Sequence, residues 1–192
     1  QEPWEVKNGS GRPFQVFTPY WRKSRAGIYR EPAQYSLQSL SFSKQDSNGL
    51  DLDELELLPE HDWHLKLSKH WEVSEGAAHK LIQRTADVIT RSYATARNIP
   101  SKDGTSRLSP YLAWGLVSPR QICQAVLDAD NDCGHRGENK YLVEIGWREF
   151  SYQLLYHFPH IADQPLREKY STFPWLDDKK SLHAWQFGNT GY

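Results

Sequence analysis

The most constraining feature of this sequence is a stripe of apolar and small residues that recurs every three or four positions after residue 74. The stripe consists of Ala78, Leu81, Ile82, Thr85, Ile89 and Tyr93. This spacing places all six on one side of an α-helix, so that side must pack against other elements. Ser74 is a suitable N-cap for the helix, and Pro100 ends the segment that follows.

Two further helix starts are indicated by a serine that precedes a proline, at Ser109–Pro110 and Ser118–Pro119. Proline suits the first helical position because the amide there has no intrahelical partner, and the serine hydroxyl is expected to cap the helix. Gln121 completes a capping box in the second case. Gly115 is expected to end the first helix, which is very short.

The longest helix is expected over residues 138–157. Its apolar residues are spread around most of the helix and are Leu142, Val143, Ile145, Phe150, Leu154 and Leu155. A helix that is apolar on nearly all sides is buried in the middle of a domain. Prolines then divide the chain into short pieces, and Ser181 is expected to start a last helix that runs through Trp185 and ends before Gly188.

The first 73 residues lack this pattern. Phe14 to Phe17 alternates weakly and predicts a short strand that ends at Pro19. Residues 41–62 are polar and acidic, which is typical of an exposed linker. The fold class that follows is mainly α, with an irregular linker before a helical domain that begins near residue 74.

Charge and cysteine content exclude several classes of protein. The net charge is -1, so the chain does not coat nucleic acid by charge alone, and the run from Trp21 to Arg25 is either a local basic patch or a solvated surface. Cys123 and Cys133 have no second pair, which predicts reduced thiols in an intracellular protein. No membrane-spanning stretch or signal peptide is present. Because the chain starts at Gln1 and lacks Met, we expect both ends to be cuts.

One candidate site lies on the long helix. Glu144, Arg148 and Ser151 are spaced four and three residues apart and share a face, with Trp147 beside them. Burying charged side chains on a mostly apolar helix costs free energy unless they form ion pairs or bind a ligand. Two interpretations stay open. Glu144 and Arg148 form an ordinary ion pair, or the face is a cavity wall on which Trp147 offers a flat ring, Glu144 accepts hydrogen bonds and Arg148 holds a negative group.

A second candidate site is the run Gly104–Ser109, in which three hydroxyls and Arg107 lead into a helix start. A helix N-terminus suits a phosphate, although an ordinary helix-entry loop has the same composition. Glycine-rich nucleotide fingerprints and nucleophile triads do not stand out in the sequence. His157 and His160 lie three apart without an obvious third ligand, so we expect no metal site.

Several motifs, in order along nearly the whole chain, resemble the DNA photolyase/cryptochrome family. They are VFTPYW at residues 16–21, GTSRLSPYLAWG at 104–115, SPRQ at 118–121, EIGWREF at 144–150, YHFP at 156–159, AWQ at 184–186 with Gly188, and TGY at 190–192. The chain is most similar in this respect to a class I cyclobutane-pyrimidine-dimer photolyase, of which it would be an internal fragment.

The resemblance implies a role for each matching residue. The residues implied to bind FAD are Tyr93, Thr105, Ser106, Arg107, Leu108, Ser109, Tyr141 and Arg148. Those implied to bind DNA or the pyrimidine dimer are Arg97, Glu144, Trp147, Arg148 and Ser151. Glu144 is also implied in catalysis, and Trp175 is implied as the outermost member of an electron relay to the flavin.

The resemblance also implies a domain plan. Residues 1–40 would be the end of an antenna-type α/β domain and the start of a linker, 41–73 the interdomain linker, and 74–192 the N-terminal half of the helical FAD-binding domain. An antenna chromophore of the folate or deazaflavin type is expected in the missing N-terminal domain. We therefore expect this piece alone neither to repair DNA nor to hold FAD tightly.

For the intact protein the resemblance implies a carbon–carbon lyase. Excited reduced flavin would pass an electron to a flipped-out cyclobutane dimer and so split it. The alternatives are a cryptochrome photoreceptor and a (6-4) photolyase, and Glu144 together with Trp147 favours repair. We expect a cytoplasmic monomer, associated with the nucleoid if the source is bacterial, whose partner is dimer-containing DNA. This account requires Thr105–Ser109 and the Glu144 face to border one hollow.

Overall fold

The protein is built from helices joined by turns. The structure is a computed structural model that describes residues 2–27, 40–41, 49–129 and 136–191. Within these ranges no strand forms, and the extended pairing is limited to an isolated antiparallel bridge between Lys7 and Pro13. The mainly α fold class predicted from the sequence is therefore confirmed.

A bent helical rod runs from residue 75 to residue 96 and carries the apolar stripe. It consists of α3 (Glu75–Arg84), the π-helical turn η4 (Thr85–Ile89) and α4 (Thr90–Ala96). The predicted cap is present, because the Ser74 hydroxyl accepts the Ala77 N–H at 3.0 Å, a contact that stabilises a helix by about 1 kcal/mol. Five members of the stripe are buried, namely Ala78, Ile82, Thr85, Ile89 and Tyr93.

The two helix starts marked by serine and proline differ in the structure. Before α6 (Pro119–Ala129) the predicted capping box forms: the Gln121 N–H donates to the Ser118 hydroxyl at 3.2 Å, and the Ser118 N–H donates to Gln121 Oε1 at 2.7 Å. In α5 (Ser109–Ala113) the prediction is wrong, since the N-cap is Leu108 and no side chain caps the helix. The reason is that Leu108 is already in the right-handed helical region, which places Ser109 inside the first turn. Gly115 follows α5 with φ +69°, as predicted for its end.

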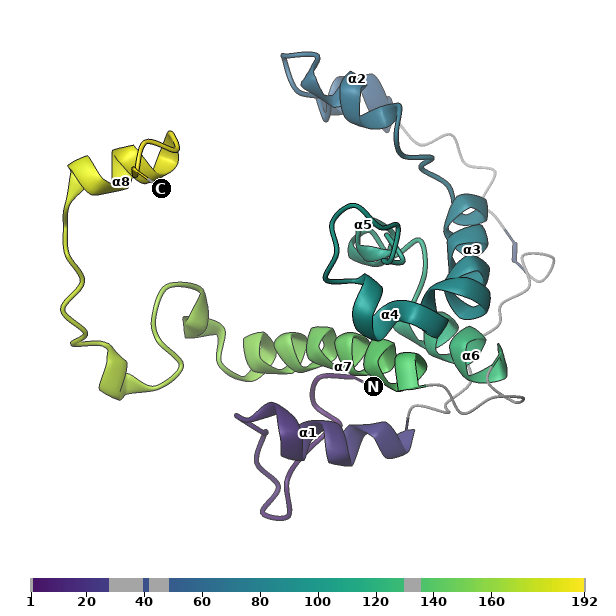
Figure 1. The fold of residues 1–192 in the computed structure, drawn as a ribbon, viewed down its shortest axis with the longest axis horizontal. Helices are drawn as coiled ribbons and strands as arrows, with labels where there is room; N and C mark the ends of the chain where they lie inside the picture. The colour runs from purple at the N-terminus through teal and green to yellow at the C-terminus, as the bar shows by residue number, and fades with distance from the viewer. Residues whose placement is uncertain (1, 28–39, 42–48, 130–135, 192) are drawn as a thin grey trace.

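The long helix α7 (Arg136–His157) is the centre of the fold (Figure 1). The rod packs against one side of α7 together with α6, and α1 packs against the opposite side. Tyr141, Leu142 and Ile145 join the main core, which also contains side chains from α3, η4, α4, α5 and α6. The expectation of a helix buried all round holds only in part, because Trp147, Tyr152, Leu155 and Tyr156 are about half exposed.

The N-terminal segment contains a helix where the sequence pattern predicts a strand. Phe17 to Ser24 form α1, and Arg25 to Gly27 continue it as the 3-10 turn η1. The strand prediction is wrong because the aromatic side chains that matter are spaced for a helix: Phe17, Tyr20 and Trp21 all face α7. Pro19 is tolerated because it lies in the first turn. Tyr20, Val6 and Phe150 form a second, smaller core.

The acidic stretch is exposed over the part that the structure describes, residues 49–62, as the sequence predicts. It includes the 3-10 turn η3 (Leu52–Leu55) and leads into the short helix α2 (Trp63–Ser68), which the sequence pattern did not indicate. Residues 28–39, in the predicted segment 1–40, and residues 42–48, in the predicted linker, lie outside the described ranges. Figure 1 shows α2 set apart from the helices around α7.

The described residues after α7 extend away from its end. They contain the 3-10 turns η5 (Pro159–Ala162) and η6 (Glu168–Tyr170) and the helix α8 (Lys179–Gln186). The last helix starts two residues before the predicted Ser181, because Asp178 is a better cap: one carboxylate oxygen accepts the N–H groups of Lys180 and Ser181 at 3.0 and 3.1 Å. Among the described residues, no helix is long and apolar enough to cross a membrane.

Candidate functional site

Two buried tyrosines join the rod to the long helix. Tyr93 on α4 and Tyr141 on α7 meet edge to face, with ring centroids 4.9 Å apart and an interplanar angle of 86°. Burial raises the pKa of the Tyr141 phenol to about 12, while a hydrogen bond with Ser106 acts in the opposite direction. Ser106 belongs to the hydroxyl-rich turn, so the turn lies close to Tyr141 on α7.

The turn from Gly104 to Ser109 lies against the end of α4. A Cβ on Gly104 would fall 2.6 Å from the backbone carbon of Ala96, so only glycine allows this approach. Arg107 has φ +55°, an uncommon conformation for a residue with a side chain. Leu108 is buried, whereas Thr105, Arg107 and Ser109 are exposed. Within the described ranges, the hydroxyls of Thr105 and Ser109 make no hydrogen bond.

A cluster of charges extends from this pair of tyrosines. Arg97, at the end of α4, lies 5.5 Å from the centre of the Tyr93 ring and forms an ion pair with Oε1 of Glu144. Lys140 approaches the same oxygen at 3.3 Å. The hydrogen bond with Glu144 is the main reason that the pKa of Arg97 is raised. Both cations contact Oε1, so Oε2 of Glu144 has no partner among the described residues and can accept a further hydrogen bond.

Trp147 lies on the side of α7 that faces α1. Its ring stacks on Phe17 with a centroid distance of 3.6 Å and an interplanar angle of 11°, and it meets Phe150 edge to face at 5.9 Å. The residue is nevertheless 45% exposed. Phe17 therefore covers one face of the indole, Phe150 contacts it edge to face, and much of the remaining surface is open to solvent.

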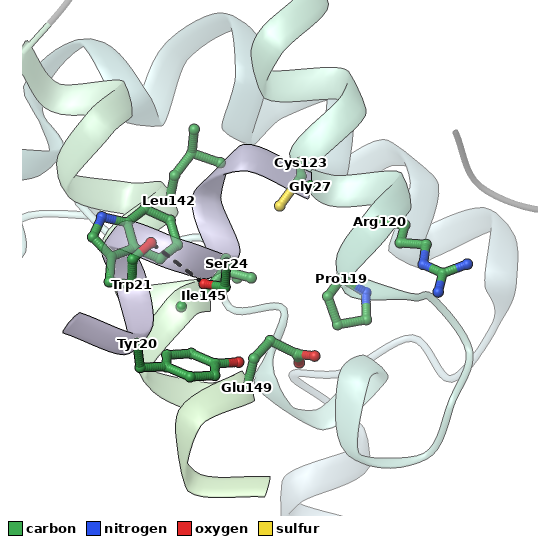
Figure 2. Close-up of a pocket in the computed structure, with 11 residues that line it drawn as sticks. Tyr20, Trp21, Ser24, Gly27, Pro119, Arg120, Cys123, Leu142, Ile145 and Glu149 are labelled. Carbon is green, nitrogen blue, oxygen red and sulfur yellow. Dashed lines mark hydrogen bonds between the residues drawn. The ribbon is translucent and has the colours of Figure 1, made fainter. Parts of the chain in front are cut away.

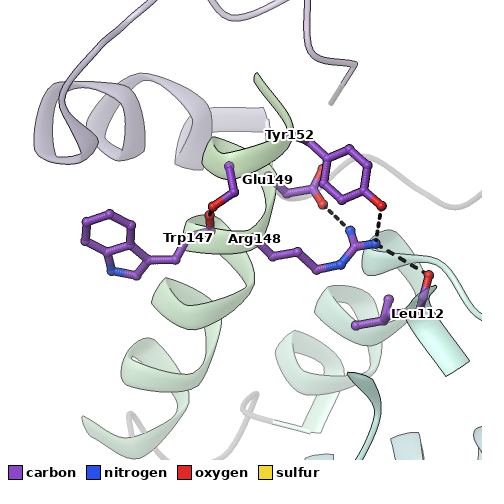
Figure 3. A network of polar contacts seen from close by, with 6 residues as sticks. Leu112, Trp147, Arg148, Glu149 and Tyr152 are labelled. Carbon is purple, nitrogen blue, oxygen red and sulfur yellow. Dashed lines mark hydrogen bonds and ion pairs between the residues drawn. The ribbon is translucent and has the colours of Figure 1, made fainter. Parts of the chain in front are cut away.

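Arg148 does not pair with Glu144, although the two are four residues apart. Its Nη1 lies 2.8 Å from a carboxylate oxygen of Glu149, and its Nη2 contacts the Leu112 carbonyl at 3.4 Å and the Tyr152 hydroxyl at 3.3 Å. Figure 3 shows Arg148 and Trp147 pointing to opposite sides of α7. Ser151 is exposed, and its hydroxyl donates to the Trp147 carbonyl at 3.0 Å. The interpretation of a Glu144–Arg148 ion pair is thus wrong.

Among the described residues, Trp175 has no ring contact with the other candidate site residues. It is 82% exposed and follows the turn η6. Its ring contacts Phe173, with centroids 4.7 Å apart. Within the part of the chain that the structure describes, no ring contact joins Trp175 to Tyr93 or Tyr141.

A small pocket of about 60 Å³ lies between α1, α6 and α7 (Figure 2). Tyr20 and Glu149 both line it, with the Tyr20 ring beside the Glu149 side chain, and the Cys123 thiol lines it from α6. Burial, followed by the charge of Glu149, raises the pKa of both Tyr20 and Cys123 to about 12. Cys123 is therefore a neutral, buried thiol, and Cys133 lies outside the described residues.

A larger pocket of about 660 Å³ is lined by Arg148, Glu149 and Tyr152 of α7 and by residues at the starts of α3 and α6. Neither pocket is lined by the Thr105–Ser109 turn or by Glu144. The described residues contain no group of three His, Cys, Asp or Glu side chains that could hold a metal ion. His157 Nε2 lies 3.2 Å from the Pro3 carbonyl oxygen.

The structure therefore brings several predicted site residues into one continuous series of contacts. The series runs from Ser106 to Tyr141, then to Tyr93, Arg97 and Glu144. Trp147, Arg148 and Ser151 share α7 with them but make their contacts elsewhere, and Trp175 is not joined to them. Lys140 and Phe17 are not among the predicted site residues. The place of Lys140 four residues before Glu144 is a signal for the ion pair, and the helical spacing of Phe17 with Tyr20 and Trp21 is a signal for α1.

The chain is similar to several known proteins. Residues 141–192 match the FAD binding domain of DNA photolyase. The deoxyribodipyrimidine photo-lyase of Agrobacterium fabrum is 33% identical over 192 residues, which are 100% of this chain and 40% of the relative. That of a strain of Thermus thermophilus is 34% identical over 180 residues, 94% of this chain and 38% of the relative. Cryptochrome-1 of Arabidopsis thaliana is 28% identical over 200 residues, 100% of this chain and 29% of the relative.

The fold is also found in a solved structure, that of a bacterial class III photolyase from Agrobacterium tumefaciens. The TM-score is 0.87 and the sequence identity 34%, over 100% of this chain and 40% of that chain. The helices thus form part of a photolyase-type helical domain, and residues 141–192 match the part of it described as FAD-binding. The chain belongs to the DNA photolyase/cryptochrome family. The solved relative is named class III, so it supports the family and not the class I assignment within it.

Proposed function

We propose that the full-length protein is a light-driven, FAD-dependent DNA repair enzyme that splits cyclobutane pyrimidine dimers. The family membership supports FAD as the cofactor, and the photo-lyases among the similar proteins favour repair. This chain spans 40% of the Agrobacterium relative, so the activity concerns the full-length protein.

The turn from Thr105 to Ser109 has the donors that the FAD phosphates need. The hydroxyls of Thr105 and Ser109 are exposed and free within the described ranges, and Arg107 adds a cation, held only loosely by Asp103 at 3.7 Å. These donors, rather than the dipole of the five-residue helix α5, would bind the phosphates. Tyr93 and Tyr141 would border the cofactor. When bound and reduced, the flavin supplies an electron on excitation by light.

The DNA-facing part consists of Arg97, Glu144 and Trp147. A dimer cannot be reached inside the duplex, so it has to be flipped out, and the damage lowers that cost. Trp147 would stack on the extruded base through its open face, and Oε2 of Glu144 would accept a hydrogen bond from it. Arg97 would hold a phosphate and fix the position of the strand without reading its sequence.

A change of partners at Glu144 would accompany binding. If a phosphate takes Arg97 away, Glu144 keeps its ion pair with Lys140 at 3.3 Å, so the carboxylate does not lose its partner. Arg148 and Ser151 would complete the wall of the dimer site, and Trp175 would pass electrons toward the flavin from the exposed C-terminal segment. These roles are proposals for the full-length protein.

The observation that carries this function is the series of contacts from Ser106 through Tyr141, Tyr93 and Arg97 to Glu144. This series joins the turn proposed to bind the FAD phosphates to the residues proposed to bind DNA. A cryptochrome photoreceptor is the second candidate, because Arabidopsis cryptochrome-1 is similar over the whole chain. The two differ in light-driven splitting of a dimer. A (6-4) photolyase would differ from the proposed enzyme in the lesion that it removes.

The replacement Trp147→Ala in the full-length protein tests the stacking role. Loss of one base stack should weaken binding to dimer-containing DNA by about 1–3 kcal/mol and leave binding to undamaged DNA nearly unchanged. Fluorescence anisotropy with matched oligonucleotides measures both affinities. Trp114→Ala is the control, since Trp114 is 85% exposed next to α5 and outside the proposed wall. Equal losses on damaged and undamaged DNA would reduce Trp147 to a packing residue.

A further inference from the structure

Three aromatic rings lie parallel between α1 and α7. Phe17 stacks on Trp147 at 3.6 Å and on Trp21 at 6.2 Å, and both interplanar angles are 11°. Phe150 meets the edges of Phe17 and Trp147 at 5.8 and 5.9 Å. Phe17 is thus held on several sides, and it covers one face of the indole of Trp147.

Gly146 makes room for this stack. A Cβ at Gly146 would lie 2.5 Å from two ring carbons of Trp21, so any larger residue would push Trp21 off α7. The position of α1 is fixed independently by Tyr20, which is 2% exposed and lies 5.1 Å from Phe150 between ring centroids. The Gln153 amide donates to the Phe14 carbonyl at 2.8 Å and adds a polar anchor between α7 and the chain before α1.

This packing limits the motion of the half-exposed indole of Trp147. A surface Trp side chain loses rotamer freedom when it binds, and that loss weakens binding unless the ring is ordered beforehand. Trp147 is 45% exposed, and Phe17 removes this freedom by covering one ring face while the other stays open.

We infer that Phe17, supported by Trp21 and Gly146, is a positioning residue that pre-orders Trp147 for stacking on an extruded base. The inference rests on the proposed function, because it assigns the open face of Trp147 to the base. It places α1 in the recognition site, although α1 lies more than a hundred residues before α7 in the chain.

Two variants of the full-length protein separate ring order from simple packing. Phe17→Leu keeps an apolar side chain but removes the flat ring, whereas Phe17→Tyr keeps the ring. Phe14→Leu is the matched control, because Phe14 packs on the same small core and contacts Tyr20, 6.3 Å away between ring centroids, and has no ring contact with Trp147 within the described residues. Thermal unfolding shows whether the two leucine variants are similarly stable.

The first readout is ¹⁹F NMR of the protein labelled with fluorotryptophan, in which the Trp147 signal is assigned by its loss in Trp147→Phe. Phe17→Leu should shift and narrow this signal toward that of the exposed Trp114, while Phe17→Tyr and Phe14→Leu should leave it in place. An unmoved Trp147 signal in Phe17→Leu overturns the inference. Should Phe17→Leu not fold, the wild-type spectrum decides, since a Trp147 signal as narrow and unshifted as that of Trp114 also overturns it.

The second readout is the ratio of affinities for dimer-containing and undamaged DNA. Phe17→Leu should lower this ratio by at least about fivefold, which is the lower end of one base stack, and Phe17→Tyr should restore it. If Trp147→Ala lowers the ratio but Phe17→Leu does not, the inference fails and the proposed function stands. If Trp147→Ala leaves the ratio unchanged, the stacking role proposed for Trp147 fails, and the fluorine signal alone decides whether Phe17 orders the ring.

Discussion

At the scale of single residues, the least expected feature is how the charges of the candidate site are paired. Glu144 and Arg148 are placed for an ion pair by their spacing, yet Glu144 pairs with Arg97 and Lys140, and Arg148 with Glu149. Glu144 with its two cations thus forms a charge cluster next to Tyr93, while Arg148 and Glu149 form a separate network that contacts α5. It leaves one carboxylate oxygen of Glu144 available among the described residues, which the proposed function requires.

Local chemistry and tertiary contacts explain why some residues could be predicted and others could not. The caps at Ser74 and Ser118 depend on residues three positions away, so the sequence alone identifies them. Arg97, one of the two partners of Glu144, lies at the end of another helix, 47 positions earlier, and no spacing rule reveals it. Leu108 caps α5 directly after Arg107, whose backbone is in the left-handed region. No pattern in the sequence predicts that conformation at Arg107.

Tyr141 gives a prediction about pH. Burial raises the pKa of its phenol from 10.0 to about 12, so the folded state holds this proton more tightly than the unfolded state does. The stability that the neutral phenol contributes is complete below pH 10.0 and is lost as the pH rises toward about 12. Tyr141→Phe should therefore make the free energy of unfolding fall less steeply over this range, as measured by urea unfolding at several pH values. Parallel curves for wild type and variant would contradict the assignment.

At the scale of elements, the two segments that carry the site are irregular pieces next to regular helices. The rod from α3 to α4 contains the π-helical turn η4, in which Thr85 donates to the Leu81 carbonyl at 2.7 Å. Such turns are frequent at functional sites, and this one precedes Tyr93 and Arg97 in the chain. The helical stripe predicts the rod, but a stripe with spacings of three and four does not distinguish a π turn from a regular one.

The turn from Gly104 to Ser109 gives a prediction about how much FAD the protein retains. Replacing Thr105 and Ser109 by alanine together removes two hydroxyls that are free within the described residues, so the full-length protein should purify with clearly less FAD. The ratio of flavin to protein absorbance measures the occupancy. Ser101→Ala with Thr95→Ala, which removes two exposed hydroxyls close by, should leave it unchanged. Unchanged occupancy in the Thr105 and Ser109 variant would remove the phosphate role of the turn.

At the scale of the whole molecule, the sequence predicted the helical class and the central position of α7, because both follow from the periodicity of apolar residues. It did not predict α1, whose aromatic residues are understood only against Trp147 and Phe150. The expected common hollow is not found in either pocket described above, since neither is lined by Thr105–Ser109 or by Glu144; the turn instead meets α7 at Tyr141 through Ser106, while Trp147 makes its ring contacts toward α1. The described residues after α7 are largely exposed, so their place in the function rests on the family.

The central claim concerns a light-driven reaction, and one measurement tests it directly. The full-length protein loaded with reduced FAD is mixed with an oligonucleotide that carries a cyclobutane dimer, and the absorbance at about 260 nm is followed because splitting restores two absorbing pyrimidines. We predict recovery of absorbance under blue light and none in the dark. Selective binding of the dimer without any recovery under light would contradict the account and favour a photoreceptor.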